Sequence, residues 1–217
     1  VYDLLDQWAE LYERSVILPS GGRLLIDETA AVTAIDVDSG GGLPSRRGED
    51  FSLATNLEAA AEIGRQILLK ELAGQIVIDF LPLRRAADQN SVKTILTKSL
   101  VSGGRDIYFF GFSAMGLFEL TRRRRWRSFN ELNLTKGPSG RRSSSLAYDI
   151  LYRLQNEDGI HPGRAVCIKC SYDVAILLRQ GKLAHYLVEI EKQIGSPVEF
   201  ETESRHDCDT FDLSLTS

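Results

Sequence analysis

The sequence predicts an α/β fold in two parts. Strand-like and helix-like segments alternate along all 217 residues, and 43% of the residues are hydrophobic. A stretch rich in Gly, Pro and Ser separates two such series, and a chain of this length can bury one sizeable core or two modest ones. We therefore expect a larger first domain over 1–135, a linker at 136–145 and a small α/β domain over 146–217.

The first part begins with a predicted helix over 2–16, where apolar residues recur at helical spacing. Thr55 and Glu58 form a capping-box pattern, which predicts a helix that ends near Leu72 with Gly74 as its C-terminal cap. The continuous apolar run that follows is typical of a buried strand. The expected strands cover residues 23–29, 31–39, 75–83, 105–113 and 116–124, and a further helix covers 87–101.

The second part has the same alternation on a smaller scale. Apolar residues at helical spacing alternate with short β-rich runs, which indicates a second small core. The expected helices cover residues 145–155, 172–180 and 185–194, and the expected strands cover 164–171, 197–203 and 210–216.

The charge is unevenly distributed along the chain. The net charge of −4 by itself disfavours nucleic-acid binding, but residues 187–217 hold eight acidic and two basic side chains. The rest of the chain therefore carries 22 acidic and 24 basic residues, and five arginines and a tryptophan fall within residues 122–127. A charge run is often only a solvated face, yet so dense an arginine cluster repels itself unless anions or acidic groups lie against it. Charge alone leaves both interpretations open.

The cysteines and the hydropathy exclude other classes of protein. Three cysteines are too few and odd in number for a disulfide scaffold, so we expect a cytoplasmic protein. Cys167 and Cys170 form a CxxC pattern, but on a strand positions three apart face opposite sides, which favours structural thiols over half of a zinc site. No apolar run reaches 18 residues, so no membrane span is predicted.

Aspartates stand where two predicted strands end. The segment AIDVDSGGG, residues 34–42, contains Asp36 and Asp38, and VIDF, residues 77–80, contains Asp79. If the two strands are neighbours, their ends lie about 5 Å apart, close enough for carboxylates to share a divalent cation. The glycines would keep the strand end open to a large substrate. The simpler alternative, in which these aspartates cap loops or pair with arginines, stays open on spacing alone.

Four segments in order resemble the catalytic core of the bacterial ribonuclease E/G family. They are LPSGG, TAIDVDSGGG, TNLEAAAEIGRQILLKELAGQIVIDF and GFSAMGLFELTRRR, and they match the family's intervals from Val16 to about Arg124. The segments SYDVAILLRQG and LVEIEKQIGSPVEFETE are similar to the small terminal domain of the shorter, G-type members.

The resemblance implies a deoxyribonuclease-like, mixed-sheet core that cuts single-stranded, AU-rich RNA with magnesium, or with manganese as a substitute. The family's two metal-binding aspartates fall on Asp36 and Asp79. Asp38 stands where the family often has asparagine, so we expect it to assist catalysis in a lesser role. Arg122, Arg123 and Arg124 match the family's basic stretch and are expected to contact RNA phosphates. If the chain forms a homodimer, we expect packing between catalytic cores to hold it together.

Three departures from the family pattern favour a second hypothesis. The cysteines that join two chains through zinc in the family are missing from residues 133–140, so no zinc link is expected. Pro82 replaces a second acid, and only Arg105 is left of a basic segment. The alternative to an enzyme is therefore a catalytically degenerate member, or an isolated core, that acts as an RNA-binding or protein-interaction module.

Overall fold

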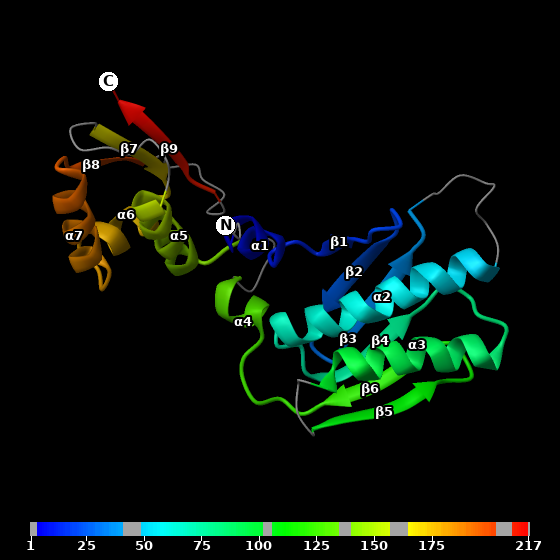
Figure 1. Cartoon of the computed structure of the whole chain (residues 1–217). Coiled ribbons are helices and arrows are strands. Elements are labelled where there is room, and N and C mark those ends of the chain that lie inside the picture. The colour runs from blue at the N-terminus through cyan, green and yellow to red at the C-terminus, as the bar shows by residue number, and fades with distance from the viewer. Residues whose placement is uncertain are drawn as a thin grey trace. The chain divides into compact units, whose positions relative to one another are not determined.

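The computed structural model divides the chain into two compact units, residues 1–130 and residues 131–217, which we call unit 1 and unit 2 (Figure 1). Both units combine helices with a β-sheet, which confirms the α/β class. None of the helices in the described parts of the chain is long and apolar enough to cross a membrane. The structure describes residues 4–40, 49–101, 106–134, 140–156, 165–202 and 210–216.

Unit 1 is built on a six-stranded mixed sheet in the order β1-β2-β3-β4-β6-β5. The central neighbours β3 and β4 are parallel, and every other neighbouring pair is antiparallel. All five strands predicted for the first part of the chain are present, and β1 is an additional short edge strand. The strands are β1 Ser15–Ile17, β2 Arg23–Glu28, β3 Val32–Asp38, β4 Gly74–Asp79, β5 Ile107–Phe112 and β6 Phe118–Arg122.

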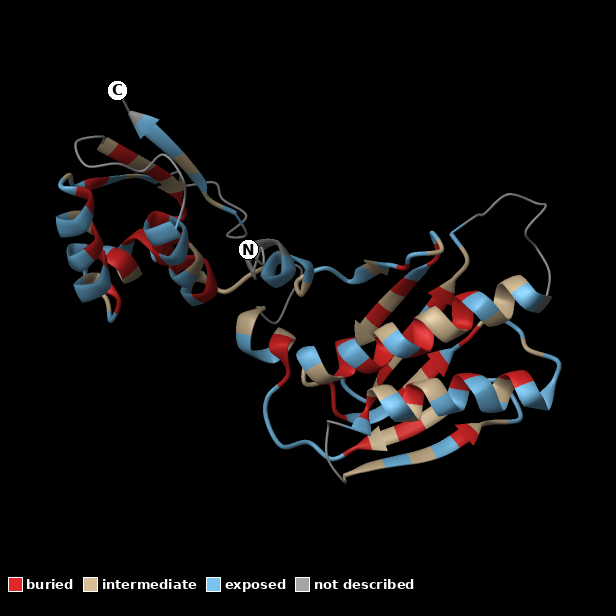
Figure 2. Ribbon diagram, in the orientation of Figure 1, coloured by how far each residue is buried: buried red, intermediate tan, exposed pale blue. Residues whose placement is uncertain are grey.

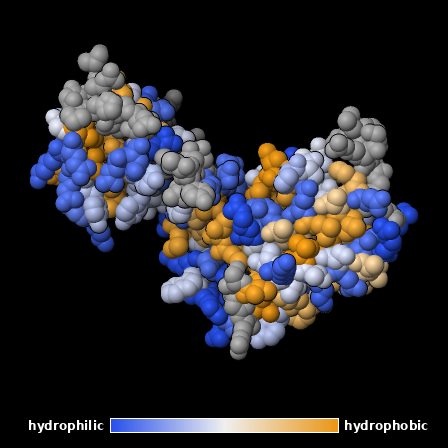
Figure 3. All heavy atoms as spheres, viewed as in Figure 1, coloured by the Kyte–Doolittle hydropathy of each residue, from blue (hydrophilic) through white to orange (hydrophobic). Residues whose placement is uncertain are grey.

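Two long helices, α2 (Glu49–Leu69) and α3 (Ala86–Ser99), lie side by side against one face of this sheet (Figure 1). Their buried sides face the sheet, and their outer sides mix hydrophilic and hydrophobic residues (Figures 2 and 3). The short helix α1 (Leu4–Glu10) also belongs to unit 1, and the short helix α4 (Phe129–Asn133) spans the boundary between the two units. The core between α2, α3 and the sheet includes Leu24, Ile35, Val37, Ile63, Ile67, Ile76, Ile78, Leu96, Phe118 and Leu120.

Two predicted helices of unit 1 have different limits in the structure. The helix expected over 2–16 ends at Glu10, because the chain then turns and Ser15 pairs with Leu25 at the sheet edge. The helix α2 begins at Glu49, so Thr55 and Glu58 lie inside it and do not cap its start. Local capping chemistry was therefore a misleading signal at this position.

Unit 2 has a three-stranded sheet in the order β8-β7-β9, with β7 parallel to β8 and antiparallel to β9. Three helices contribute to its separate apolar core. The predicted helices and strands of this part are all present, with ends shifted by a few residues. They are α5 Ser143–Asn156, β7 Ala165–Cys170, α6 Tyr172–Arg179, α7 Ala184–Ile194, β8 Val198–Thr202 and β9 Asp212–Thr216.

Candidate active site

The carboxylates of Asp36 and Asp79 leave the sheet side by side. β3 and β4 are parallel neighbours, and Asp36 and Asp79 are direct partners in their register. Paired residues of adjacent strands point to the same face and are separated by about 4.8 Å along the hydrogen-bond direction. The prediction that these two strand ends are neighbours is confirmed.

The alternation of side chains explains why these positions tolerate charge. Ile35, Val37 and Ile78 are buried under the helices, whereas Asp36 and Asp79 are exposed on the opposite face. Among the described residues, neither carboxylate forms an ion pair or a hydrogen bond. Two adjacent, unpaired carboxylates repel one another, and a bound cation would relieve that repulsion.

Asp38 lies on the same face but is engaged by its neighbours. Its Oδ2 accepts hydrogen bonds from Arg23 Nε at 2.9 Å and Arg23 Nη2 at 2.6 Å, and its Oδ1 accepts one from the Gly40 N–H at 2.9 Å. The Gly40 amide and the Arg23 guanidinium lower the pKa of the Asp38 carboxyl. Asp38 therefore stabilises the turn that follows β3.

The glycines beside the aspartates are required by close backbone packing. A Cβ on Gly40, which has φ of +72°, would lie 1.9 Å from the Gly21 carbonyl oxygen, and a Cβ on Gly22 would lie 2.9 Å from the Asp38 carbonyl oxygen. The turn after β3 thus abuts the LPSGG turn before β2. Gly40 therefore has a packing role in addition to the expected one of keeping the strand end open. Residues 41 and 42 lie outside the described residues.

Asn56 holds the segment that follows Asp79, a role that the sequence did not reveal. Its side chain is completely buried on α2. The Nδ2 group donates to the Leu81 carbonyl oxygen at 2.8 Å, and Oδ1 accepts from the Leu81 N–H at 3.0 Å. Two residues further along α2, Glu58 Oε2 accepts from the Ser20 N–H at 2.9 Å. One helix therefore fixes loops at both sides of the aspartate pair. The TN pair was a weak signal, because α2 contains several other polar and charged residues.

The three arginines expected to contact RNA occupy different environments. Arg122 is buried, and its Nη1 lies 2.8 Å from Glu71 Oε2 and donates to the Leu72 carbonyl oxygen at 3.0 Å. Arg123 and Arg124 are exposed. This placement corrects the expectation for Arg122, whose guanidinium is occupied by protein groups. Residue Arg122 pairs with Gly74, so the arginines begin at the opposite end of β4 from Asp79.

The site offers two carboxylates, which suits a metal ion such as magnesium that takes its other ligands from water and substrate. It does not suit a metal ion that is coordinated entirely by protein groups. In the described parts of the chain, no group of three or more His, Cys, Asp or Glu side chains could hold a metal. Magnesium is commonly bound by one or two carboxylates, with waters and substrate phosphates as its other ligands. Asp36 and Asp79 fit that requirement, and the exposed face leaves room for the other ligands.

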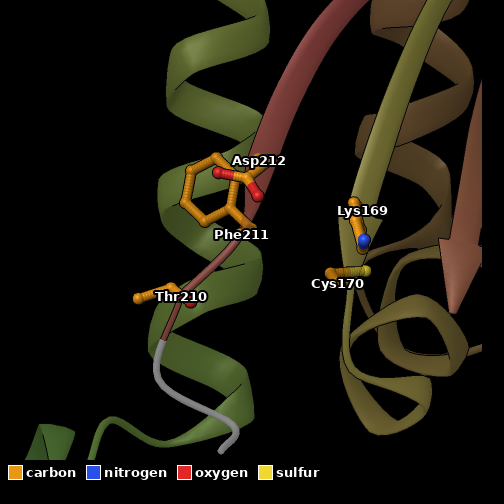
Figure 4. Close-up of a pocket in the computed structure, with 5 residues that line it drawn as sticks. All are labelled: Lys169, Cys170, Thr210, Phe211 and Asp212. Carbon is orange, nitrogen blue, oxygen red and sulfur yellow. The ribbon is translucent and has the colours of Figure 1, made fainter. Parts of the chain in front are cut away.

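The described part of unit 2 contains a small pocket. A small pocket between β7 and the start of β9 has a volume of about 30 Å³, enough for a water or two. Figure 4 shows Lys169 and Cys170 on one side and Thr210, Phe211 and Asp212 on the other. Burial raises the pKa of the Cys170 thiol to about 11, so this thiol is a poor nucleophile at neutral pH.

The cysteines of β7 face opposite sides of the strand, as predicted. Cys170 is buried in the core of unit 2, whereas Cys167 is partly exposed on the other face. Burial and then the carboxylates of Glu201 and Glu199 raise the pKa of the Cys167 thiol. Residues 135–139, most of the predicted zinc-link position, and Cys208 lie outside the described residues.

Comparisons with known proteins agree with the motifs. The ribonuclease E/G family matches residues 1–125. Over 99% of its length, the chain is 31% identical to ribonuclease G of Escherichia coli K12 and covers 46% of that protein. It is 27% identical over 98% of its length to ribonuclease G of Haemophilus influenzae, covering 45% of it, and 36% identical over 72% of its length to ribonuclease E of E. coli K12, covering 15%. The chain thus spans about half the length of the ribonuclease G proteins that it matches.

Proposed function

Because the chain belongs to the ribonuclease E/G family, we propose that it is the catalytic core of a magnesium-dependent endoribonuclease that cuts single-stranded, AU-rich RNA. One observation carries the proposal: Asp36 and Asp79 are register partners on an exposed sheet face. The names of the ribonuclease G and ribonuclease E relatives support RNA as the substrate. Under this proposal unit 1 has the deoxyribonuclease-like fold of the family's core.

Asp36 and Asp79 would hold the metal ion. When bound, magnesium supplies an activated water and stabilises negative charge on the phosphate. Asp38 keeps the β3 end in place through Arg23 and the Gly40 turn, so it assists without being a main ligand. Arg123 and Arg124, both exposed, would position the RNA backbone.

The loops around the site are held by protein groups before any substrate arrives. Asn56 fixes the chain after Asp79, and Glu58 fixes the LPSGG turn beside β3. Fixed ligand positions lower the cost of organising the site when metal and RNA bind. This arrangement favours the enzyme over the interaction module. Pro82 and the Asp38 carboxylate, which is engaged by Arg23, are the features that favour the module.

The first test removes one negative charge at a time from the aspartate pair. Asp36→Asn and Asp79→Asn preserve shape, so Mn²⁺ affinity measured by calorimetry should fall, and cleavage of a labelled single-stranded, AU-rich RNA with Mg²⁺ should drop by orders of magnitude. Asp38→Asn should have a smaller effect, because asparagine still accepts the Gly40 hydrogen bond. The protein in its full-length form is assayed beside this chain.

Asp27→Asn is the matched control for these variants. Asp27 lies on β2 of the same sheet and forms a surface ion pair with Arg14, so the loss of its charge should change cleavage and metal binding little. Folding of the Asp36 and Asp79 variants should be unchanged or slightly improved, because one of two repelling carboxylates is removed. If the unsubstituted protein binds RNA but cuts no better than the two variants, the interaction-module hypothesis replaces the enzyme.

A further inference from the structure

The sheet face that carries Asp36 and Asp79 is distinct from the face covered by helices. In the described part of unit 1, both long helices pack on the opposite face, against residues such as Ile35 and Ile78. Alternate residues of the strands therefore point away from the helices. These include Leu25, Ala34 and Val77 between the charged positions, and all three are only partly exposed. The result is a broad sheet surface continuous with the aspartate pair.

Two large aromatic side chains are exposed on the edge strand of this surface. Tyr108 is 65% exposed and Phe110 is 69% exposed, whereas Ile107, Phe109 and Phe112 of the same strand pack against the core. Burying rings of this size away from water would be favourable, so their exposure carries a cost in free energy. An exposed apolar patch on a protein surface commonly marks a binding site. The alternation along β5 therefore places Tyr108 and Phe110 on the side away from the helices.

A β-bulge at Phe110 explains why Phe110 and Phe112 lie on opposite sides of the sheet. The register shifts between Phe109 and Gly111, so that Phe109 pairs with Leu120 and Gly111 pairs with Glu119. Gly111 has φ of +95°, a conformation that glycine adopts without strain. Phe110 is the inserted residue opposite Glu119, and Glu119 points to the same face as Asp79. Without the bulge, Phe110 and Phe112 could not take opposite sides of the sheet.

The rings lie within reach of one nucleic-acid strand bound at the aspartates. In the sheet order β4-β6-β5, β5 is two strands away from β4, which corresponds to about 10 Å across the sheet. Val77 of β4 is the register partner of Glu119 of β6, which lies opposite the bulge at Phe110. Asp79 is two residues beyond Val77, so Phe110 and Asp79 are roughly 12 Å apart across the surface. Tyr108 pairs with Thr121, one row nearer to the arginines that follow β6.

The charges around the rings favour a nucleic acid over an apolar protein segment. The exposed Arg123 and Arg124 follow Arg122 at the end of β6, and the Arg123 N–H donates to the Asp106 carbonyl oxygen beside the start of β5. The rings thus lie between guanidinium groups at one end and the aspartate pair at the other. Glu119 would repel a phosphate placed beside Phe110, which leaves base stacking as the favourable contact there.

We propose that Tyr108 and Phe110 form a base-stacking platform for single-stranded RNA, which positions the strand across the open sheet face for the site at Asp36 and Asp79. The inference rests on the proposed function and adds two binding residues to it. Sheet surfaces with exposed aromatics bind single strands in this way because every base has a face that can stack on a ring. The platform binds bases with little regard to sequence, and the arginines contribute the salt-dependent part of the affinity.

The test measures binding without cleavage. Fluorescence anisotropy with a labelled single-stranded RNA, in the absence of divalent metal, compares the protein with Tyr108→Ala, Phe110→Ala and the double variant. Each ring removed should weaken binding about fivefold or more, without changing the slope of affinity against salt, because no charge is lost. Tyr172→Ala is the matched control, since Tyr172 is 64% exposed on α6 in unit 2. Its affinity should equal that of the unsubstituted protein.

An RNA with single abasic positions separates stacking from a general loss of affinity. The unsubstituted protein should lose affinity when the stacked base is removed, whereas the double variant should lose nothing further. If the protein binds RNA and the ring variants bind equally well, the platform is wrong, and the face is left for a protein partner. If the unsubstituted protein binds no RNA, the proposed function fails together with the platform.

Discussion

Replacing Asn56 by alanine tests whether the structure has identified the element that holds the site. Asn56 is completely buried, and its two hydrogen bonds join α2 to the backbone N–H and carbonyl of Leu81. The variant loses both bonds and leaves two backbone groups without these partners. At about 1–2 kcal/mol for each group, the free energy of unfolding should fall by about 2–4 kcal/mol. Because Leu81 is partly exposed, water can replace some of the loss, which favours the lower half of this range.

Tryptophan fluorescence during urea unfolding measures this effect in the correct unit. The sequence has two tryptophans, Trp8 and Trp126, and both belong to unit 1. Trp8 lies edge-to-face on Phe129, with ring centroids 5.2 Å apart, so its emission should change when the unit unfolds. Asn90→Ala, on the exposed side of α3, is the control and should change stability by less than about 0.5 kcal/mol.

A second variant at the same position separates the donor from the acceptor. Asn56→Asp keeps an acceptor for the Leu81 N–H but places a buried carboxylate against the Leu81 carbonyl oxygen. Burial and that carbonyl should raise the pKa of the new carboxyl, so the folded state binds its proton more tightly than the unfolded state. This variant should therefore become less stable as the pH rises above about 4. An Asn56→Ala protein within about 0.5 kcal/mol of the unsubstituted one would refute the reasoning.

Three further predictions concern Arg122, the two exposed arginines and the thiol of Cys170. Arg122→Ala should destabilise unit 1 by about 3 kcal/mol, because it leaves Glu71 and the Leu72 carbonyl without their partner, and it should leave the salt slope of RNA binding unchanged. Arg123→Ala and Arg124→Ala should each reduce the slope of log affinity against log salt concentration by about one, as binding titrations at several salt concentrations can measure. An unchanged slope would mean that these two arginines are only solvated and do not contact RNA phosphates. Cys170, with a pKa of about 11, should resist alkylation in the native protein at pH 8 and react after unfolding, as peptide mass mapping can show. Rapid native modification would contradict its burial.

Local sequence was sufficient for the strands that carry the aspartates. In AIDVDS, apolar and polar residues alternate with the period of a strand, and VIDF ends a continuous apolar run. Each side chain's face depends only on its immediate neighbours in the chain, so periodicity predicts it. The prediction that Asp36 and Asp79 lie side by side also required the strands to be neighbours, which the structure confirms.

Other features depended on residues that are distant in sequence. The burial of Arg122 depends on Glu71, whose own φ of +51° turns the chain after α2 toward the end of β6. The role of Asn56 depends on Leu81, 25 residues away. In both cases the local pattern is ambiguous, because an arginine at the end of a strand and an asparagine next to a threonine are more often exposed.

The sequence by itself determined the α/β class, the order of the main elements, the family and the two aspartates as candidates. The tertiary structure decided the register of Asp36 with Asp79, the engagement of Asp38 by Arg23, and the shared face of Phe110 and Glu119. The physical reason is that hydrophobic periodicity is set by neighbours within one segment. Pairing across a sheet, by contrast, depends on which distant segments pack together, and no single segment encodes that choice.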